Sequence, residues 1–382
     1  MKIYLVVVLA ILGQAGFGGS RVAVPLYALE LGASQFTVGL IIGLYSLCPL
    51  FFSIAMGKMS DRVPPGMPMA VGAAMMVVAL LLPAAAPHLV TLYVTALLLG
   101  AGHLAFDLPL EANVGGMGGA RHRARNYALI TMAWSIANFV GPLIAGFCID
   151  TLGHRYAFAA LAALAGLPVL ILWARPTLLP HAVKASVHGQ RGSVVDLWRI
   201  SDLRATFIAG GIIGSAQNLF QFYMPVYGHA VGLSASSIGT VLGTVALAAF
   251  VIRAFMPLLT RRFTERTILK AAIFVAAFAY LLLPFFADPF VLSAIAFVLG
   301  LGVGSGQPMI MSLFYVLAPA GRIAEASGVY KTLRGITQII VPVLFGSVGA
   351  AFGFRAVFLS NAGLLLLGGY LQRHRIGRSP RS

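Results

Sequence analysis

The chain contains few charged residues. They make up 9% of its 382 residues, and only 10 are acidic, whereas about a quarter of the residues in ordinary soluble domains are charged. Hydrophobic residues make up 59%. So few charged side chains cannot cover so large an apolar fraction in water, and the composition therefore excludes an ordinary soluble domain.

Cysteine and the common catalytic motifs are also scarce. The two cysteines, Cys48 and Cys148, lie inside long apolar stretches and indicate neither a disulfide framework nor a metal site. No glycine-rich phosphate loop, H-E-x-x-H or G-x-S-x-G motif occurs, which argues against an ATP-driven pump and an intramembrane enzyme. We expect no enzyme, no metal and no cofactor.

Long apolar stretches recur along the whole chain. Crossing about 30 Å of hydrocarbon takes about 20 apolar residues, and in lipid each segment must satisfy its own backbone hydrogen bonds, which requires helices. We therefore predict an all-α integral membrane protein with twelve transmembrane helices. These are 3–29, 36–56, 68–86, 89–112, 126–150, 156–174, 204–228, 235–257, 268–286, 289–315, 324–350 and 353–371.

The net charge of +16 follows the membrane topology. Lysine and arginine gather at every second boundary, whereas the loops near 30, 87, 230 and 288 carry none. Positive residues concentrate on the cytoplasmic side, so both termini are predicted to be cytoplasmic in a plasma (inner) membrane. We expect contact with anionic lipid and no nucleic acid. The basic residues are Lys2, Lys58, Arg62, Arg121, Arg123, Arg125, Arg175, Lys184, Arg191, Arg199, Arg261, Arg262, Arg266, Lys270, Arg322, Arg373, Arg375, Arg378 and Arg381.

The chain repeats itself. "PLYALELGASQFTVGLIIG" begins at Pro25 and "PVYGHAVGLSASSIGTVLG" at Pro225, an offset of 225 − 25 = 200. "PLIAGFCIDTLGHRYAF" from Pro142 matches "PVLFGSVGAAFGFRAVF" from Pro342 at the same offset. We predict two six-helix bundles, 1–174 and 204–382, joined by a cytoplasmic linker at 175–203. Parallel repeats of this kind imply a substrate site between the halves near the midplane and alternating access.

The short polar loop "GKMSDR" follows the second predicted span. Its G-x-x-x-D-R pattern, formed by Gly57, Asp61 and Arg62, resembles the signature motif of the major facilitator superfamily. Together with the twelve predicted spans in two parallel halves, the resemblance covers essentially the whole chain. The resemblance implies a cytoplasmic gate: Gly57 permits close approach, and Asp61 favours the positive end of a helix. The family's following Gly and basic residues are replaced by V-P-P-G-M-P, and an ordinary basic topology loop is the alternative.

"NFVGPLIAG", residues 138–146, resembles the fifth-span motif of drug–proton antiporters in this superfamily. Gly141, Pro142 and Gly146 match, while Ala145 replaces an expected glycine. Small residues permit close helix contacts, and proline permits a bend. The resemblance implies export, with ordinary helix packing as the alternative. The arginine typical of the fourth span of those exporters is absent at 95–99.

Polar residues in the predicted spans fall at helical spacing and across the repeat, so that Arg21 corresponds to Gln221 and Asn138 to Gln338. In the resembled family these spans line the central cavity. Arginine suits carboxylate or phosphate groups, although Arg21 and Arg334 could instead extend to the interfaces. We assign Arg253 to the interface near the cytoplasmic end of 235–257. The predicted substrate-binding residues are Gln14, Arg21, Trp134, Asn138, Gln217, Asn218, Gln221, Arg334 and Gln338.

His103, Asp107 and Glu111 follow one another at four-residue spacing within the fourth predicted span. Ionisable residues inside a span are unfavourable, and a carboxyl group there can carry a proton. We predict proton coupling by these three residues. Alternatively, Glu111 pairs with Arg62 or a base of 121–125 as part of the gate.

The sequence thus predicts a monomeric secondary transporter for small molecules and protons, exporting a small, anionic or amphipathic organic compound. The alternative is proton-coupled uptake of an organic-acid metabolite. A non-transporting receptor or scaffold would not need polar residues at matched positions of the two repeats. The direction of transport and the substrate stay open.

Overall fold

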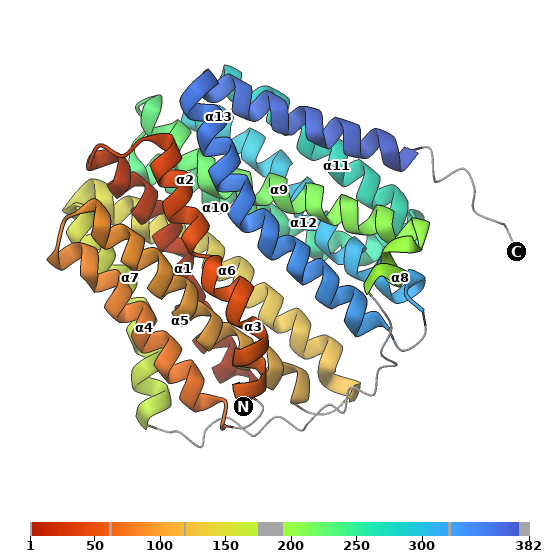
Figure 1. Ribbon diagram of the computed structural model, residues 1–382, viewed down its shortest axis with the longest axis horizontal. Coiled ribbons are helices and arrows are strands. Elements are labelled where there is room, and N and C mark those ends of the chain that lie inside the picture. The colour runs from red at the N-terminus through yellow and green to blue at the C-terminus, as the bar shows by residue number, and fades with distance from the viewer. Residues whose placement is uncertain (1, 61–62, 118–119, 175–193, 320–321, 374–382) are drawn as a thin grey trace, which may run out of the picture. The chain divides into compact units, whose positions relative to one another are not determined.

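The computed structural model describes all residues except 1, 61–62, 118–119, 175–193, 320–321 and 374–382 (Figure 1). In the described part, every regular element is helical, which confirms the predicted all-α class. The elements are α1 (Lys2–Glu30), α2 (Gln35–Leu44), α3 (Leu47–Ser60), α4 (Gly66–Ala85), α5 (Leu89–Gly116), α6 (Ala120–Leu152), α7 (His154–Ala174), α8 (Val194–Arg199), α9 (Ser201–Ala230), α10 (Ala235–Arg262), α11 (Glu265–Leu282), the 3-10 turn η1 (Leu283–Phe285), α12 (Pro289–Leu317) and α13 (Ile323–Arg373).

Ten segments of the described chain are long and apolar enough to cross a membrane. The predicted span 204–228 lies in α9, which is not one of the ten. The predicted spans 324–350 and 353–371 both lie in α13, which is interrupted at Gly353 by a non-helical backbone. The chain therefore forms a multi-pass helical membrane protein, and the number of twelve transmembrane helices stays a prediction.

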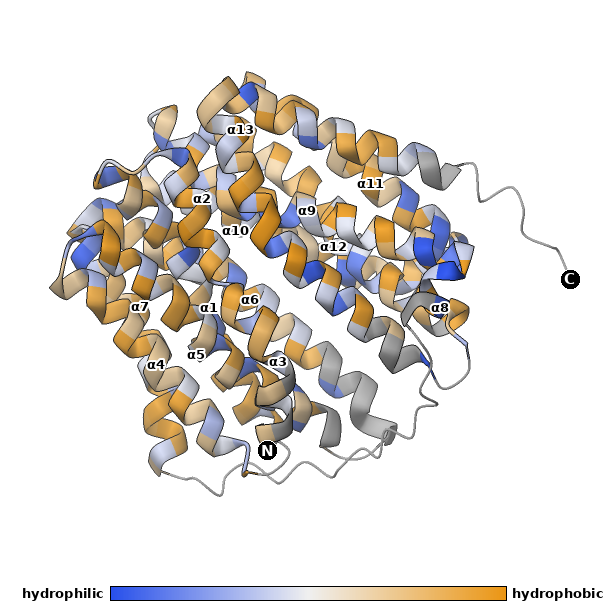
Figure 2. Ribbon diagram, viewed as in Figure 1, coloured by the Kyte–Doolittle hydropathy of each residue, from blue (hydrophilic) through white to orange (hydrophobic). Residues whose placement is uncertain are grey.

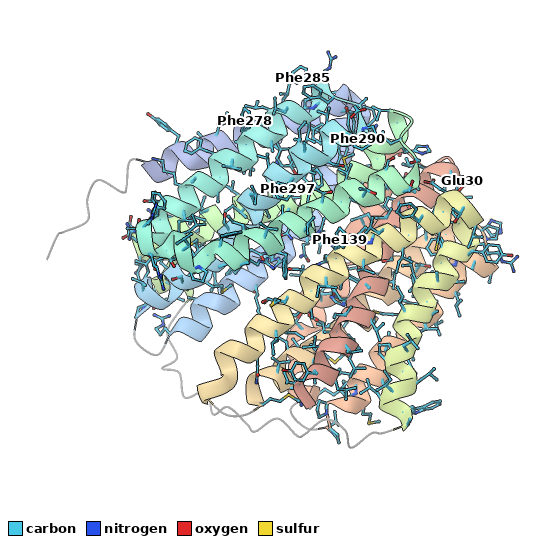
Figure 3. All side chains as sticks on the ribbon, turned by 180° about the vertical axis from the view of Figure 1, so that it is seen from behind. Glu30, Phe139, Phe278, Phe285, Phe290 and Phe297 are labelled. Carbon is cyan, nitrogen blue, oxygen red and sulfur yellow. The ribbon has the colours of Figure 1, made fainter. Side chains whose placement is uncertain are left out.

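Hydrophobic residues make up much of the helices (Figure 2). Phe290 is 84% exposed and Trp173 is 81% exposed, and Figure 3 labels Phe278, Phe285 and Phe290 among the exposed aromatic side chains. Soluble monomers rarely expose extensive apolar patches. These faces are therefore suited to lipid, in agreement with the scarcity of charge in the sequence.

The chain forms two compact units. The first comprises 1–186 and 222–243, and the second comprises 187–221 and 244–382. In the first, α1 packs against α5, α6 and α7, and α4 packs against α5 and α7 (Figure 1). In the second, α11 packs against α12 and α13. The ends of α9 and α10 around 222–243 thus belong to the first unit, although the sequence repeat assigns them to the second half. The predicted repeat boundaries themselves stay a prediction.

The loops carry the repeat in their backbone geometry. Gly32 and Gly232 both have φ of 80°, and Gly153 and Gly353 have φ of 88° and 78°. A positive φ favours glycine because it has no Cβ. These four glycines are aligned at the offset of 200, so the same turns are built twice, as the sequence repeat predicted.

Close helix contacts are repeated in the same way. A Cβ on Gly100 would come within 3.0 Å of the Tyr45 carbonyl oxygen, and one on Gly300 would come equally close to the Val245 carbonyl oxygen. Position 45 corresponds to 245 and position 100 to 300. Each repeat therefore brings two backbones together at an equivalent place, and each place requires a residue without a side chain.

Candidate functional site

A cluster of polar and aromatic side chains lies around Arg21 in the first unit. The Arg21 guanidinium carbon is 5.1 Å from the centre of the Phe17 ring, which permits a cation–π interaction. Phe17 also stacks on the His103 ring of α5, with 3.8 Å between the ring centres. A permanent cation and a titratable imidazole therefore contact the same aromatic ring.

The break between α2 and α3 supports this cluster. Tyr45, at the end of α2, is buried and donates a hydrogen bond of 3.1 Å to Ser20 Oγ. Ser20 Oγ in turn donates to the Phe17 carbonyl oxygen at 2.7 Å. Gly100 brings α5 against the Tyr45 backbone. These contacts fix the segment of α1 that carries Phe17 and Arg21.

Two of the predicted substrate-binding residues meet in this unit. Gln14 Nε2 of α1 donates to Asn138 Oδ1 of α6 at 3.3 Å. The helices approach closely nearby, because a Cβ on Gly19 would lie 2.8 Å from the Gly141 carbonyl oxygen. The close packing expected at Gly141 is therefore present, and it brings Asn138 within reach of Gln14.

The other end of the fifth-span motif contacts the beginning of α10. A Cβ on Gly146 would come within 3.0 Å of the Ala235 carbonyl oxygen, and one on Gly239 would come equally close to the Pro142 carbonyl oxygen. The side chain of Phe139, labelled in Figure 3, lies 3.1 Å from the place of a Cβ on Gly243. The predicted packing role of Gly146 is thus seen against a helix of the second sequence half.

Asp150, on the last turn of α6, strengthens this contact and was not predicted. Its carboxylate accepts hydrogen bonds from the backbone N–H of Ala235 at 2.9 Å and of Ser236 at 2.7 Å. These N–H groups lie in the first turn of α10, where they have no acceptor within the helix and where the helix dipole favours an anion. Asp150 is one of only 10 acidic residues in the chain. Its position at the end of the predicted span 126–150 was the signal in the sequence that could have indicated this role.

The three predicted proton-coupling residues lie in order along α5. His103 is packed on Phe17, and its Nδ1 is buried with no hydrogen-bond partner among the described residues. Asp107 and Glu111 are half-buried one and two turns further along. Their shared stripe on one helix is present, whereas proton coupling itself stays a prediction.

A second group of polar side chains lies in the second unit. Gln307 Nε2 of α12 donates to Gln217 Oε1 of α9 at 3.1 Å, and Arg253 Nη2 of α10 donates to Gln307 Oε1 at 3.4 Å. Arg253 thus contacts a side chain of a neighbouring helix, and helix α10 continues nine residues beyond it, to Arg262. Its placement near the interface stays a prediction. Gln307 was not predicted, although at the repeat offset of 200 it corresponds to Asp107, which was the available signal.

The remaining predicted residues are placed as follows. Trp134 Nε1 and Asn218 Nδ2 are buried without hydrogen-bond partners in the described part of the chain. Gln221 of α9 and Gln338 and Arg334 of α13 are half-buried in the second unit. The two residues of each repeat pair, Arg21–Gln221 and Asn138–Gln338, lie in different units. That they bind one substrate together stays a prediction.

Most of the predicted cytoplasmic gate lies outside the described residues, which omit Asp61 and Arg62. Gly57 is described, and a Cβ there would lie 3.9 Å from Leu108 Cδ2, an ordinary contact. The close approach expected at Gly57 is therefore absent from the described part of the structure, because its nearest neighbour leaves room for a side chain. The gate itself stays a prediction.

These features define a multi-pass helical membrane protein built from two related halves, with polar clusters inside its units. The family model described as Major Facilitator Superfamily matches residues 5–342. The chain belongs to this family.

Curated relatives and solved structures agree with this membership. Multidrug resistance protein MdtG of Enterobacter lignolyticus is 26% identical over 236 residues, covering 59% of this chain and 56% of that protein. The MdtG of Klebsiella pneumoniae is 25% identical over 254 residues, covering 64% and 61%. The chain thus spans less than two thirds of the length of these relatives.

Solved structures share the fold at low identity. A crystal structure of the nucleoside transporter NupG has a TM-score of 0.83 at 12% identity and covers 98% of this chain and 99% of its own. One of the peptide transporter POT also has a TM-score of 0.83, at 14% identity, and covers 98% and 94%. At these identities the likeness concerns the fold alone.

Proposed function

We propose that this protein is a secondary active transporter that exports a small organic compound by alternating access, driven by protons. The observation that carries the proposal is the contact of α6 with α10. Helices from the two sequence halves are tied at one end by Gly146, Gly239 and the Asp150 carboxylate. Alternating access in a protein of two parallel halves requires such a contact to form and open in each cycle.

Export is supported by two observations. The contact of α6 with α10 involves the fifth-span motif, which resembles that of drug–proton antiporters. The curated relatives bear the name multidrug resistance protein. The polar cluster at Arg21 of the first unit contains a positive charge, and a positive charge suits an anionic or amphipathic compound.

Uptake of an organic acid together with a proton is the second candidate, and the geometry around Phe17 favours it. The Arg21 guanidinium and the His103 ring both contact Phe17, at 5.1 and 3.8 Å, so their centres are at most about 9 Å apart. At that separation, two positive charges repel by about 2 kcal/mol for an effective dielectric constant near 20. An anion bound at Arg21 would offset this repulsion and so favour a proton on His103. Cotransport requires the substrate and the proton to be bound together in this way.

Flux in proteoliposomes tests the function and separates the two directions. Purified protein is reconstituted, a pH gradient of either sense is imposed, and the movement of a panel of labelled organic anions and cations is followed. Export by antiport predicts that substrate accumulates on the acidic side, whereas cotransport predicts accumulation on the alkaline side. The absence of flux for every compound in both gradients would reject a transporter and favour a receptor or scaffold.

Replacing Arg21 with glutamine is expected to reduce the affinity for an anionic substrate by about 10- to 100-fold, because a charged hydrogen bond contributes about 1.5–3 kcal/mol. A neutral analogue of the same shape should lose much less, since the loss concerns charge rather than packing. The apparent affinities of both compounds are measured in the flux assay. An equal loss for the two would make Arg21 a structural residue that supports Phe17.

We further propose a plasma-membrane location with cytoplasmic termini and a monomeric protein in contact with anionic lipid. The alternation of basic and neutral loops supports this topology. Labelling of a cysteine introduced near residue 382 only after the membrane is permeabilised would agree with it. Labelling of intact cells by a membrane-impermeant reagent would reverse the orientation.

A further inference from the structure

A group of basic side chains lies where α10 is connected to α11 in the second unit. Arg261 and Arg262 are exposed in the last turn of α10, and a connection of two residues, 263–264, leads to α11. Lys270 is half-buried and follows five residues after the start of α11, about 8 Å along its axis. The bases are thus not confined to the loop but extend into a candidate membrane span.

The acidic side chains of this region are bound to other groups. Asp202 Oδ2 of α9 accepts a hydrogen bond from Arg266 Nη2 at 2.7 Å, and Glu265 Oε1 accepts one from Ser312 Oγ of α12 at 3.3 Å. Among the residues that the structure describes, none of the three bases named above forms an ion pair. In this part of the chain, three positive charges therefore lie on one short segment without a carboxylate to neutralise them.

The sequence repeat shows that membrane topology does not by itself require these bases. At the offset of 200, Arg261 corresponds to Asp61 and Lys270 to Ala70. The first half thus has an acid and an apolar residue where the second half has two bases, although the topology rule predicts the same side of the membrane for both loops. The second half therefore lacks an anion at the position where the first half has its own.

Next to the basic group, α11 exposes an apolar face. The helix packs against α12 and α13, and its opposite face, spaced as one side of a helix, presents Thr267, Ala271 and Phe278. Phe278, labelled in Figure 3, is 56% exposed. Lys270 borders this face, and Phe278 follows eight residues later, about 12 Å along the axis. A phospholipid has the matching order, with an anionic group at one end and apolar chains below it.

We propose that Arg261, Arg262 and Lys270 bind the headgroup of one anionic phospholipid, with an acyl chain along the exposed face of α11. The backbone limits the Cα atoms of Arg262 and Lys270 to a separation of at most about 19 Å, which two long basic side chains bridge with a phosphate between them. Basic residues at cytoplasmic helix ends attract the anionic lipids of that leaflet, and guanidinium suits phosphate. The inference rests on the proposed topology and assigns a site to the proposed contact with anionic lipid.

Titration of the purified full chain with lipid in detergent micelles tests the site. Dioleoyl phosphatidylglycerol is the anionic probe, and dioleoyl phosphatidylcholine, which has the same acyl chains and no net charge, is its match. Native mass spectrometry gives the number of bound lipids and their dissociation constants. Because each basic residue near an anionic lipid contributes about 5-fold in binding, Lys270→Gln should weaken phosphatidylglycerol binding by about 5-fold. Adding Arg261→Gln and Arg262→Gln should weaken it by about 100-fold and leave phosphatidylcholine within about 2-fold.

Two controls separate a lipid site from general attraction to charge and from misfolding. Arg199→Gln removes another exposed arginine of the same unit and should change phosphatidylglycerol binding by less than about 2-fold, since a charge outside the site is screened by salt. Arg261→Lys combined with Arg262→Lys keeps both charges and should bind within about 5-fold of the wild type. Thermal unfolding without added lipid should be the same in all variants, because the altered side chains are not in the core.

Equal affinity of the wild type for the two lipids, or unchanged phosphatidylglycerol binding in the triple glutamine variant, would overturn the site. A loss in Arg199→Gln as large as that in Lys270→Gln would also overturn it, in favour of a diffuse surface charge. Binding of sn-glycerol 3-phosphate as tight as that of phosphatidylglycerol would indicate a site for free phosphate instead of a lipid. The micelles have no gradient, so lipid binding is measured whether or not the protein transports, and the flux assay decides the proposed function separately.

Discussion

A valine in place of Gly146 is expected to abolish transport while the protein still inserts into the membrane. In the structure a Cβ at this position would come within 3.0 Å of the Ala235 carbonyl oxygen, and valine adds two further methyl groups. Backbone cannot yield as a flexible side chain can, so α6 and α10 must separate at this end. If transport requires this contact once per cycle, the variant stays in the states in which the contact is open.

Flux and a distance measurement together test this expectation. Spin labels are introduced at Leu152 and His229, two exposed positions of the first unit, in a background without Cys48 and Cys148. Gly146→Val should lower flux by more than 10-fold and shift the label distance toward longer values. Gly363→Val is the matched control, because a Cβ at Gly363 would meet nothing within 4 Å. Normal flux in Gly146→Val would mean that this contact plays no part in the cycle.

Asparagine in place of Asp107 is expected to abolish uphill transport and to preserve substrate binding and downhill exchange. A gradient-driven transporter needs a group that binds a proton on one side and releases it on the other, and an amide cannot do so. The second half has Gln307 at the equivalent position, so an amide is accommodated at this depth of the fold. The variant should therefore fold normally.

Two assays on the same vesicles separate coupling from binding. Accumulation of substrate against its gradient is measured with an imposed pH gradient, and exchange is measured without one. Glu111→Gln and His103→Gln are measured alongside, because both residues share the stripe with Asp107 on α5. If Asp107→Asn still concentrates substrate, the proton is carried by His103 or Glu111, and the variant that loses accumulation identifies which.

The sequence alone determined the helical membrane class and the internal repeat. Both follow from local rules, since lipid forces each apolar segment to satisfy its own hydrogen bonds and glycine marks the turns that need a positive φ. Gly32, Gly153, Gly232 and Gly353 can therefore be aligned in pairs from the amino-acid order by itself. Gly141 could also be assigned to close packing, because its motif requires a small residue whatever the partner helix is.

Only the tertiary structure decided which side chains meet. The capping of α10 by Asp150 and the chain from Arg253 through Gln307 to Gln217 join segments separated by 50 or more residues. Such contacts depend on how each helix is rotated about its axis and where it ends, and hydropathy fixes neither. The sequence therefore could not show that Arg253 of α10, which continues to Arg262, donates to Gln307 of α12.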